Sequence, residues 1–298
     1  MTTHKTDGYA KPTIPGADPD TRKPRIALPA GSCDCHAHLF GPQDKYPYEA
    51  NRRYTPPDAS MDDYLKMLGV LGVERAVLVQ PSVYGTDNTL MLDALRATKF
   101  PLRGIAVIDD EISDAELASM HAAGVRGLRL NLRAKGSAAP EDVAPRVAQR
   151  IAPLGWHLQL RINPQDLANA EALVDRLPVP VVVDHFGAVA VEEGVQGKTF
   201  QTILGLARRS RCFIKLSAPM RMSRQELPYA DVLPFVHALV KAAPGQLLWG
   251  TDWPHTTLAQ SMPNDGDLCD LLADWMPDLA TRQQVLVDNP ARVYGFLD

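Results

Sequence analysis

The chain has 298 residues, of which 45% are hydrophobic and 22% charged, the balance of an ordinary soluble globular protein. Its formal net charge of −4, without any basic stretch, argues against a nucleic-acid partner. No apolar run reaches the roughly 18 residues that a membrane span needs. The N-terminus lacks the apolar core of a signal peptide, and four cysteines are too few for a disulfide framework, so we expect a cytoplasmic protein.

The first 30 residues differ in composition from the rest. They are rich in Thr, Lys, Asp and Pro and show no hydrophobic period. This pattern predicts a flexible or loosely docked N-terminal arm over residues 1–30. Residues 31–298 are then expected to form a single domain.

From Gly31 onward, short apolar runs of β character alternate with amphipathic segments of helical length. The eight strand candidates are 33–39, 75–80, 103–108, 126–132, 156–162, 180–185, 212–217 and 246–251. Such alternation implies parallel pairing with right-handed crossovers. Eight units in this length predict an α/β fold, a (β/α)8 TIM-type barrel. The alternative, an open doubly wound sheet, should carry a glycine-rich phosphate loop, and neither G-x-G-x-x-G nor a Walker pattern occurs.

Residues typical of helix ends mark several of the segments between these strands. Ser60 precedes an apolar stripe at helical spacing, and Ser113 with Glu116 fits a capping box that Gly124 closes. Further helices are expected to begin near Pro140, Pro164 and Thr199.

Polar side chains follow the apolar part of most predicted strands. In a TIM barrel these strand ends meet at one mouth, where active sites lie, and burying surplus polar groups there without a role would be costly. The run 181–183 ends on Asp184 and His185, and the run 247–250 is followed by Asp252. The other polar residues at strand ends are His36, His38, Gln80, Ser82, Arg129, Asn131, Arg161, Lys215 and Ser217.

The first strand carries two histidines two residues apart. A period of two would send Asp34, His36 and His38 to one face and Cys33 and Cys35 to the other. Two imidazoles on one rigid strand can hold a metal or polarise a carbonyl, although a polar core explains the pair equally well. The same alternation separates the thiols from the histidines, so we expect structural burial of the cysteines. Asp34 is expected to orient a histidine or a neighbouring strand.

Taken together and in this order, the motifs resemble the amidohydrolase superfamily. They are most similar to its group of 2-pyrone-4,6-dicarboxylate lactonases, D-galactarolactone isomerases and 4-sulfomuconolactone hydrolases. The pieces that carry the resemblance are Asp-Cys-His-Ala-His-Leu-Phe-Gly-Pro at 34–42, 79–88, Arg-Gly-Leu-Arg-Leu-Asn at 126–131, Asp-His-Phe-Gly at 184–187, Trp-Gly-Thr-Asp-Trp-Pro-His at 249–255 and Asn-Pro-Ala-Arg at 289–292.

The resemblance implies catalytic and substrate-binding roles for particular residues. His36, His38 and His185 would polarise a lactone carbonyl, and Asp252 would take the proton from the attacking water. The substrate-binding positions that match are Tyr54, Ser82, Arg129, Arg221 and His255. A mouth rich in arginine suits an anionic substrate, because a guanidinium grips a carboxylate through two hydrogen bonds.

Three positions depart from the lactonase pattern. Ala188 stands where an arginine is expected, Arg161 replaces a tyrosine on the fifth strand, and Lys135 replaces another arginine. We therefore expect Lys135 and Arg161 to bind substrate. A carboxylate, sulfonate or hydroxyl would then occupy a different place than on pyrone dicarboxylate.

The charges of the predicted site bear on metal binding. The permanent charges of Arg129 and Arg161 disfavour a two-metal centre. A single zinc on His36, His38, His185 and Asp252 is chemically sound. The resemblance implies both a metal-free lactonase and zinc-using relatives, and protonated histidines or arginines can activate a lactone. We expect no metal, with one zinc as the alternative.

The predicted reaction is acyl transfer at the carbonyl of an anionic, carboxylated lactone, and hydrolysis of a dicarboxylate lactone is the favoured form. A hydroxyl of the substrate in place of water would give a lactone isomerase. A zinc-dependent decarboxylase and a non-catalytic binder of carboxylated small molecules are the two competing functions. The only partner that the sequence predicts is a small anionic lactone.

Overall fold

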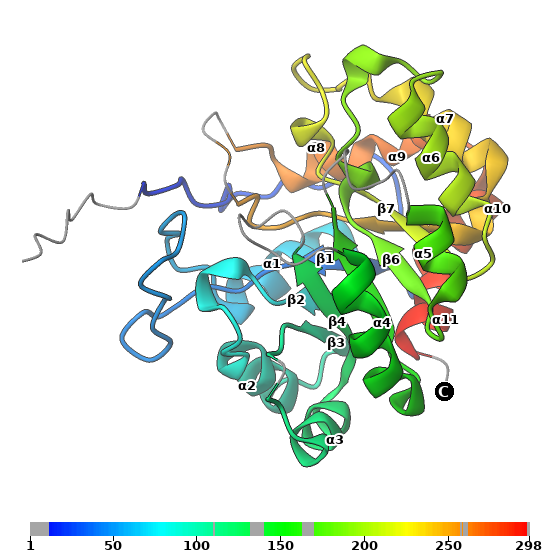
Figure 1. The fold of residues 1–298 in the computed structure, drawn as a ribbon. Coiled ribbons are helices and arrows are strands. Elements are labelled where there is room, and N and C mark those ends of the chain that lie inside the picture. The colour runs from blue at the N-terminus through cyan, green and yellow to red at the C-terminus, as the bar shows by residue number, and fades with distance from the viewer. Residues whose placement is uncertain are drawn as a thin grey trace, which may run out of the picture.

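Eight parallel strands pair in chain order, from β1 to β8, and form the (β/α)8 barrel that the sequence predicts (Figure 1). The computed structural model describes residues 12–109, 111–131, 140–162, 170–256, 258 and 262–296. The strands are β1 Cys33–Ala37, β2 Arg75–Val79, β3 Leu102–Ala106, β4 Val125–Asn131, β5 His157–Arg161, β6 Val181–Val183, β7 Cys212–Ser217 and β8 Leu247–Gly250. Every predicted strand is present.

The barrel closes through residues that follow β8. The Asp252 N–H donates to the carbonyl of His36 at 2.8 Å, and the His38 N–H donates to the carbonyl of Trp253 at 2.8 Å. A parallel bridge joins Ala37 and Trp253. The backbone that closes the barrel therefore carries three of the four predicted catalytic residues.

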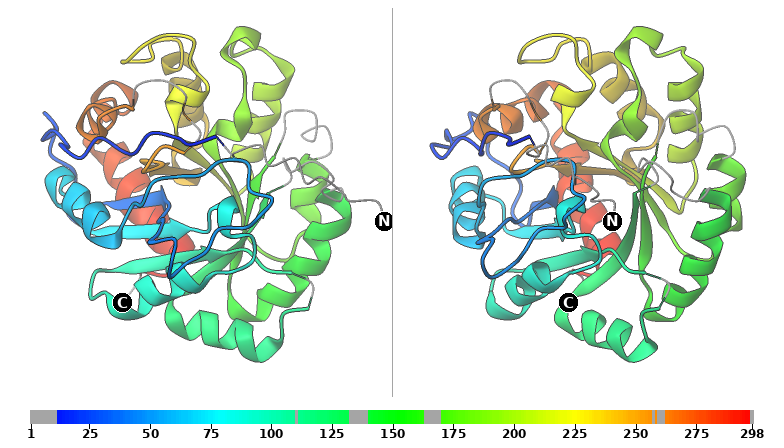
Figure 2. Two further views of the ribbon diagram at one scale, coloured as in Figure 1. Left: turned by 90° about the vertical axis from the view of Figure 1, so that its left-hand side faces the viewer. Right: turned by 60° about the vertical axis from the view of Figure 1, so that its left-hand side comes forward.

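Helices surround the strands and cover the outer face of the barrel (Figure 2). They are α1 Met61–Leu71, α2 Thr89–Ala97, α3 Asp114–Ala123, α4 Pro140–Ile151, α5 Ala170–Arg176, α6 Lys198–Ala207, α7 Leu233–Ala242, α8 Asp265–Asp270, α9 Leu272–Trp275, α10 Leu279–Gln283 and α11 Asn289–Tyr294. Among the described residues, no helix is long and apolar enough to cross a bilayer.

The helix ends follow the caps that the sequence predicts. Ser60 and Ser113 both form capping boxes, and Gly124 ends α3 in the left-handed conformation that glycine adopts easily. The helix start that we expect near Pro164 lies outside the described residues.

A bulge in β1 changes which side chains face the interior. Asp34 pairs with Ala76 and Ala37 with Leu78, so three steps along β1 match two along β2. Cys33 and Cys35 pack into a buried cluster with residues of the other strands, including Val79. Asp34 instead accepts a hydrogen bond from Tyr64 of α1. Asp34 therefore faces away from the cysteines, as expected. The expectation that it shares a face with the histidines is wrong, because the bulge interrupts the alternation and His36 contacts Asp184 and Lys215 inside the barrel. All four cysteines are free and buried, which confirms the burial expected of Cys33 and Cys35.

The described part of the predicted arm, residues 12–30, runs past the loop after β1 and reaches α8 (Figures 1 and 2). The Ile14 N–H donates to the carbonyl of Thr55 at 3.2 Å, and the Thr55 N–H donates to the carbonyl of Pro12 at 2.8 Å. Farther along, the Arg22 N–H donates to the side chain of Asn264 at 2.9 Å. This stretch is docked on the barrel by hydrogen bonds at both of its ends.

Candidate active site

Three imidazoles surround one carboxylate oxygen at the mouth of the barrel. Asp252 Oδ1 lies 3.6 Å from His36 Nε2, 3.8 Å from His38 Nε2 and 3.7 Å from His185 Nε2. The three histidines come from β1, the residue after it and the second residue after β6. The structure thus brings together the four residues that the sequence proposes as catalytic.

The backbone at these strand ends is strained. His185, Ala218, Asp252 and His255 all have positive φ angles, between 48° and 65°. Non-glycine residues in this conformation cost about 1–3 kcal/mol each and cluster at functional sites. The strain follows β6, β7 and β8, so it concentrates at the mouth.

His38 has a defined neutral form. Its Nδ1 lies 2.6 Å from the carbonyl of Val79, which can only accept, so Nδ1 carries the proton. Burial and the charge of Arg129 lower the pKa of His38 to about 4. At neutral pH, therefore, His38 Nε2 presents a lone pair to the site.

The other two imidazoles are also held neutral. Burial, reinforced by Lys215, lowers the pKa of His36 well below its usual range. Burial, reinforced by Arg221 and Arg161, lowers the pKa of His185 to about 3. His185 Nδ1 lies 2.8 Å from the hydroxyl of Ser217, which fixes the orientation of the ring.

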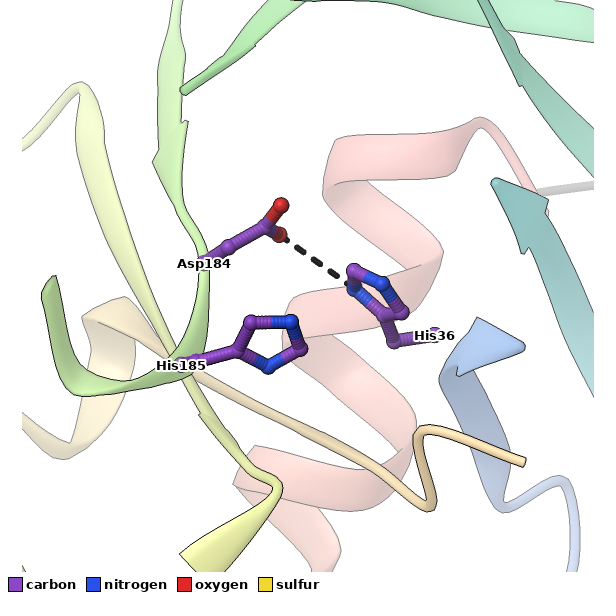
Figure 3. A group of neighbouring side chains, drawn as sticks. All are labelled: His36, Asp184 and His185. Atoms are coloured by element: carbon purple, nitrogen blue, oxygen red, sulfur yellow. Dashed lines mark ion pairs between the residues drawn. The ribbon is translucent and has the colours of Figure 1, made fainter. Parts of the chain in front are cut away.

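A buried layer of charge lies beneath His36. Asp184 Oδ1 is 3.3 Å from His36 Nδ1, and Figure 3 shows this contact beside His185. Arg129 donates to the other oxygen of Asp184 from Nε at 3.1 Å and from Nη2 at 2.9 Å. Lys215 Nζ lies 3.2 Å from His36 Nδ1 and donates to Gln159 at 2.8 Å. Although burial opposes it, the neighbouring positive groups hold the pKa of Asp184 well below its usual range.

Arg221 fixes the second oxygen of Asp252. It donates to Oδ2 from Nε at 3.1 Å and from Nη2 at 2.8 Å, and it also donates to the carbonyl of Thr256. Burial would raise the pKa of Asp252, but Arg221 and the surrounding histidines outweigh it and hold that pKa below its usual range. Asp252 is therefore a carboxylate with one oxygen pinned and the other facing the imidazoles.

A cavity of about 110 Å³ opens beside His185. Arg161 and Arg221 line it together with the apolar side chains Ile162, Ala188, Val189, Ala218 and Met222. The Tyr54 hydroxyl is buried, which raises its pKa, and it interacts with Thr256 and Ser82 and with the charges of both arginines. Tyr54 therefore lies near Ser82, Arg161 and Arg221, the other predicted substrate-binding residues on this side of the mouth.

The other three residues predicted to bind substrate are not placed on this cavity by the structure. Arg129 is 5% exposed and committed to Asp184. His255 is fully buried and pairs with Asp265, its Nε2 lying 3.2 Å from Oδ1. Burial would lower the pKa of His255, but Asp265 outweighs it and raises that pKa. Lys135 lies outside the described residues.

Two charged residues of the site were not assigned a role from the sequence. Asp184 belongs to a motif quoted for the resemblance, and Lys215 stands alone between the apolar residues Ile214 and Leu216. A lysine within an apolar strand signals a buried charge, but its partners are set only by the closed barrel.

The donor atoms at the mouth fit a single metal ion. Asp252 Oδ1 lies 3.6–3.8 Å from one nitrogen of each imidazole, and imidazole nitrogens and carboxylate oxygens are the ligand atoms that zinc prefers. His36 Nε2 and Asp252 Oδ1 are buried and have no hydrogen-bond partner among the described residues. His36, His38 and Asp252 form one group that could hold an ion, and His36, Asp184 and His185 form a second.

Comparison with known proteins places the chain in a family. The Amidohydrolase family model matches residues 33–296. The chain is 39% identical to a 2-pyrone-4,6-dicarboxylate hydrolase of Comamonas testosteroni, over 97% of this chain and 95% of the relative. It is 37% identical to a 4-sulfomuconolactone hydrolase of Hydrogenophaga intermedia, over 91% of each chain. A D-galactarolactone isomerase of Agrobacterium fabrum is 26% identical over 91% of this chain and 93% of the relative.

A solved structure agrees with these relatives. A protein of Acinetobacter baumannii, described as a probable 2-pyrone-4,6-dicarboxylic acid hydrolase with citric acid bound, superposes with a TM-score of 0.78. The two sequences are 29% identical, and the matched region covers 89% of this chain and 100% of the solved structure. The chain belongs to the amidohydrolase family, as the motifs predict.

Proposed function

We propose that this amidohydrolase opens the ring of a small anionic lactone by hydrolysis. One observation carries the proposal: Asp252 Oδ1 faces three buried imidazoles while Arg221 pins Oδ2. The relatives at 37% and 39% identity are described as lactone hydrolases, whereas the isomerase is at 26%. Hydrolysis is therefore favoured over ring exchange.

In the proposed reaction Asp252 is the general base. A water oxygen attacks the lactone carbonyl carbon while Asp252 Oδ1 takes the proton of that water. The ring C–O bond then breaks, and the departing oxygen takes up the proton. The products are a carboxylate and a hydroxyl on one open chain. Pinning of Oδ2 by Arg221 leaves Oδ1 as the oxygen that faces the substrate.

The arginines on the wall of the cavity favour binding of an anionic substrate. Arg161 and Arg221 line the cavity beside the apolar surface of Ile162 and Val189, although Arg221 also pairs with Asp252 and Asp184 lines the cavity as well. A lactone with a carboxylate or sulfonate next to a hydrocarbon part matches both features. Citrate in the related structure is itself a carboxylate ligand.

Metal binding at this site is a separate part of the proposal. The sequence favours a metal-free site, with one zinc as the alternative. His38 Nε2, which carries a lone pair, lies 3.8 Å from Asp252 Oδ1. Because both atoms are hydrogen-bond acceptors, a cation or a proton donor between them would stabilise this arrangement. We therefore favour one zinc-like ion on His36, His38, His185 and Asp252. When bound, such an ion would supply Lewis-acid polarisation of the carbonyl.

A panel of lactones tests the function. We expect turnover on carboxylated or sulfonated lactones, with one proton released per ring opened, and much weaker turnover on the matching uncharged lactones. Ring exchange, followed separately by NMR, would identify an isomerase. Carbon dioxide release would identify a decarboxylase, and binding without turnover would identify a carboxylate-binding protein.

A further inference from the structure

Asp265 lies outside every motif from which the sequence predicts the site, yet its carboxylate reaches a residue of the mouth. It is the first residue of α8, and its Oδ1 lies 3.2 Å from His255 Nε2. Both side chains are 0% exposed. Within the described part of the chain, neither oxygen of Asp265 has a hydrogen-bond partner, so the ion-pair contact with His255 is the polar contact that holds this buried side chain.

His255 closes the turn that carries Asp252. The His255 N–H donates to the carbonyl of Asp252 at 2.7 Å. Asp252 and His255 have φ angles of 65° and 61°, a conformation that persists only where its surroundings enforce it. The bond from the Asp252 N–H to the carbonyl of His36, at 2.8 Å, holds one end of the turn, and His255 holds the other.

We propose that Asp265 is a positioning residue for Asp252: it fixes His255, and His255 fixes the turn that aims Asp252 Oδ1 at the three imidazoles. His255 then acts on Asp252 through the turn. The kinetic part of this inference rests on the proposed lactone hydrolysis, whereas the structural part does not.

The N-terminal arm holds Asp265 in place. Asn264 caps α8, since its Oδ1 accepts from the Gly266 N–H at 3.1 Å and from the Arg22 N–H at 2.9 Å. Its Nδ2 donates to Asp18 at 2.8 Å. A Cβ at Gly266 would lie 2.0 Å from the carbonyl oxygen of Arg22, so the arm packs directly on the residue after Asp265. A continuous set of contacts thus links the arm to the base.

Kinetics of Asp265→Asn on an active lactone test the inference. We expect kcat to fall about 10- to 100-fold, as for other residues that orient a catalytic group, while KM stays within about threefold. Asp270→Asn is the matched control, since Asp270 lies on the same helix and pairs with Arg25 of the arm without contacting His255. It should keep kcat within about twofold. An unchanged kcat for Asp265→Asn, or a rise in KM alone, would overturn the inference.

A second variant distinguishes the positioning role from a general folding defect. His255→Gln should show the same loss of kcat, and the double variant should be no slower than the slower single variant, because both act through one contact. Additive losses would count against the inference.

A crystal structure of Asp265→Asn gives a readout that needs no activity. We expect Asp252 to leave its positive φ, or Oδ1 to move away from the histidines. An unchanged turn would refute the positioning role even if the wild-type chain hydrolysed lactones. A displaced turn in a chain that opens no lactone would reject the proposed function and keep the positioning role.

Discussion

Arg221 donates two hydrogen bonds to the same oxygen of Asp252, from Nε at 3.1 Å and from Nη2 at 2.8 Å. Because both bonds end on Oδ2, they orient the carboxylate and leave Oδ1 free of this arginine. Oδ1 is the atom that faces the three imidazoles. Arg221 therefore determines both the charge and the direction of the proposed base.

Replacement of the base gives the most direct prediction. Asp252→Asn keeps the shape of the side chain but removes its ability to take a proton, so we expect kcat on an active lactone to fall about 10²- to 10⁴-fold. Circular dichroism should show an intact fold. Asp175→Asn, at an exposed pair with Arg209, is the control and should leave kcat unchanged. Near-full turnover by Asp252→Asn would remove Asp252 from the mechanism.

Removal of Arg221 should change the pH dependence of the reaction. Arg221 is the largest of the influences that lower the pKa of Asp252, while burial raises it. Arg221→Met should therefore raise that pKa, so that the carboxylate form is lost at a higher pH than in the wild-type chain. The acid limb of kcat/KM should move to higher pH by about one unit or more.

Arg221→Lys separates charge from geometry. Lysine keeps the positive charge but cannot donate two bonds in the fork that Arg221 forms. We expect the acid limb to stay near its wild-type position while kcat falls. An acid limb that does not move in Arg221→Met would show that another group controls it.

Metal content is measurable by elemental analysis of protein purified without added metal. If the lone pairs at the mouth hold an ion, about one zinc per chain should be found, and chelation should abolish turnover. His38→Gln should lower the zinc content. His237→Gln should not, because His237 lies on α7, where its Nε2 is 2.8 Å from the carbonyl oxygen of Asp274. Full activity in metal-free protein would support the prediction from the sequence that the site works without a metal.

The barrel was predictable because its signals are local. Each strand is a short apolar run, and each helix start depends on a cap such as Ser60 or Ser113. The mouth was predictable for the same reason, since parallel strands end together and His185 and Asp252 follow two of them. The fold, and the gathering of the catalytic residues at the mouth, could therefore be predicted without knowing which distant residues are in contact.

The register of β1 and the buried partners were not predictable in this way. The bulge between Asp34 and Ala37 is a property of pairing with β2, which the sequence of β1 alone does not encode. Asp265 has the signature of a helix-start acid, and only the closed barrel places it beside His255. Lys215 likewise gains its partners Gln159 and Asp184 from other strands.

Asp34 should make stability depend on pH. It accepts bonds from Thr251, Tyr64 and the backbone of His36, but burial dominates and raises its pKa to about 6. The folded chain then holds this proton more tightly than the unfolded chain. Its contribution to stability is greatest below the unfolded pKa and is lost as the pH rises through about 6, a change on the order of 2–3 kcal/mol.

Asp34→Asn tests this dependence. Its amide oxygen can keep the two backbone donors, and the hydroxyls of Thr251 and Tyr64 can turn to accept from its nitrogen. We expect the variant to gain stability relative to the wild-type chain between pH 4 and pH 7, measured by urea unfolding at both values. Other titrating groups cancel in the difference between the two proteins. A difference in unfolding free energy that is the same at both pH values would show that the pKa of Asp34 is not raised in the folded chain, because its four hydrogen bonds would then offset the effect of burial.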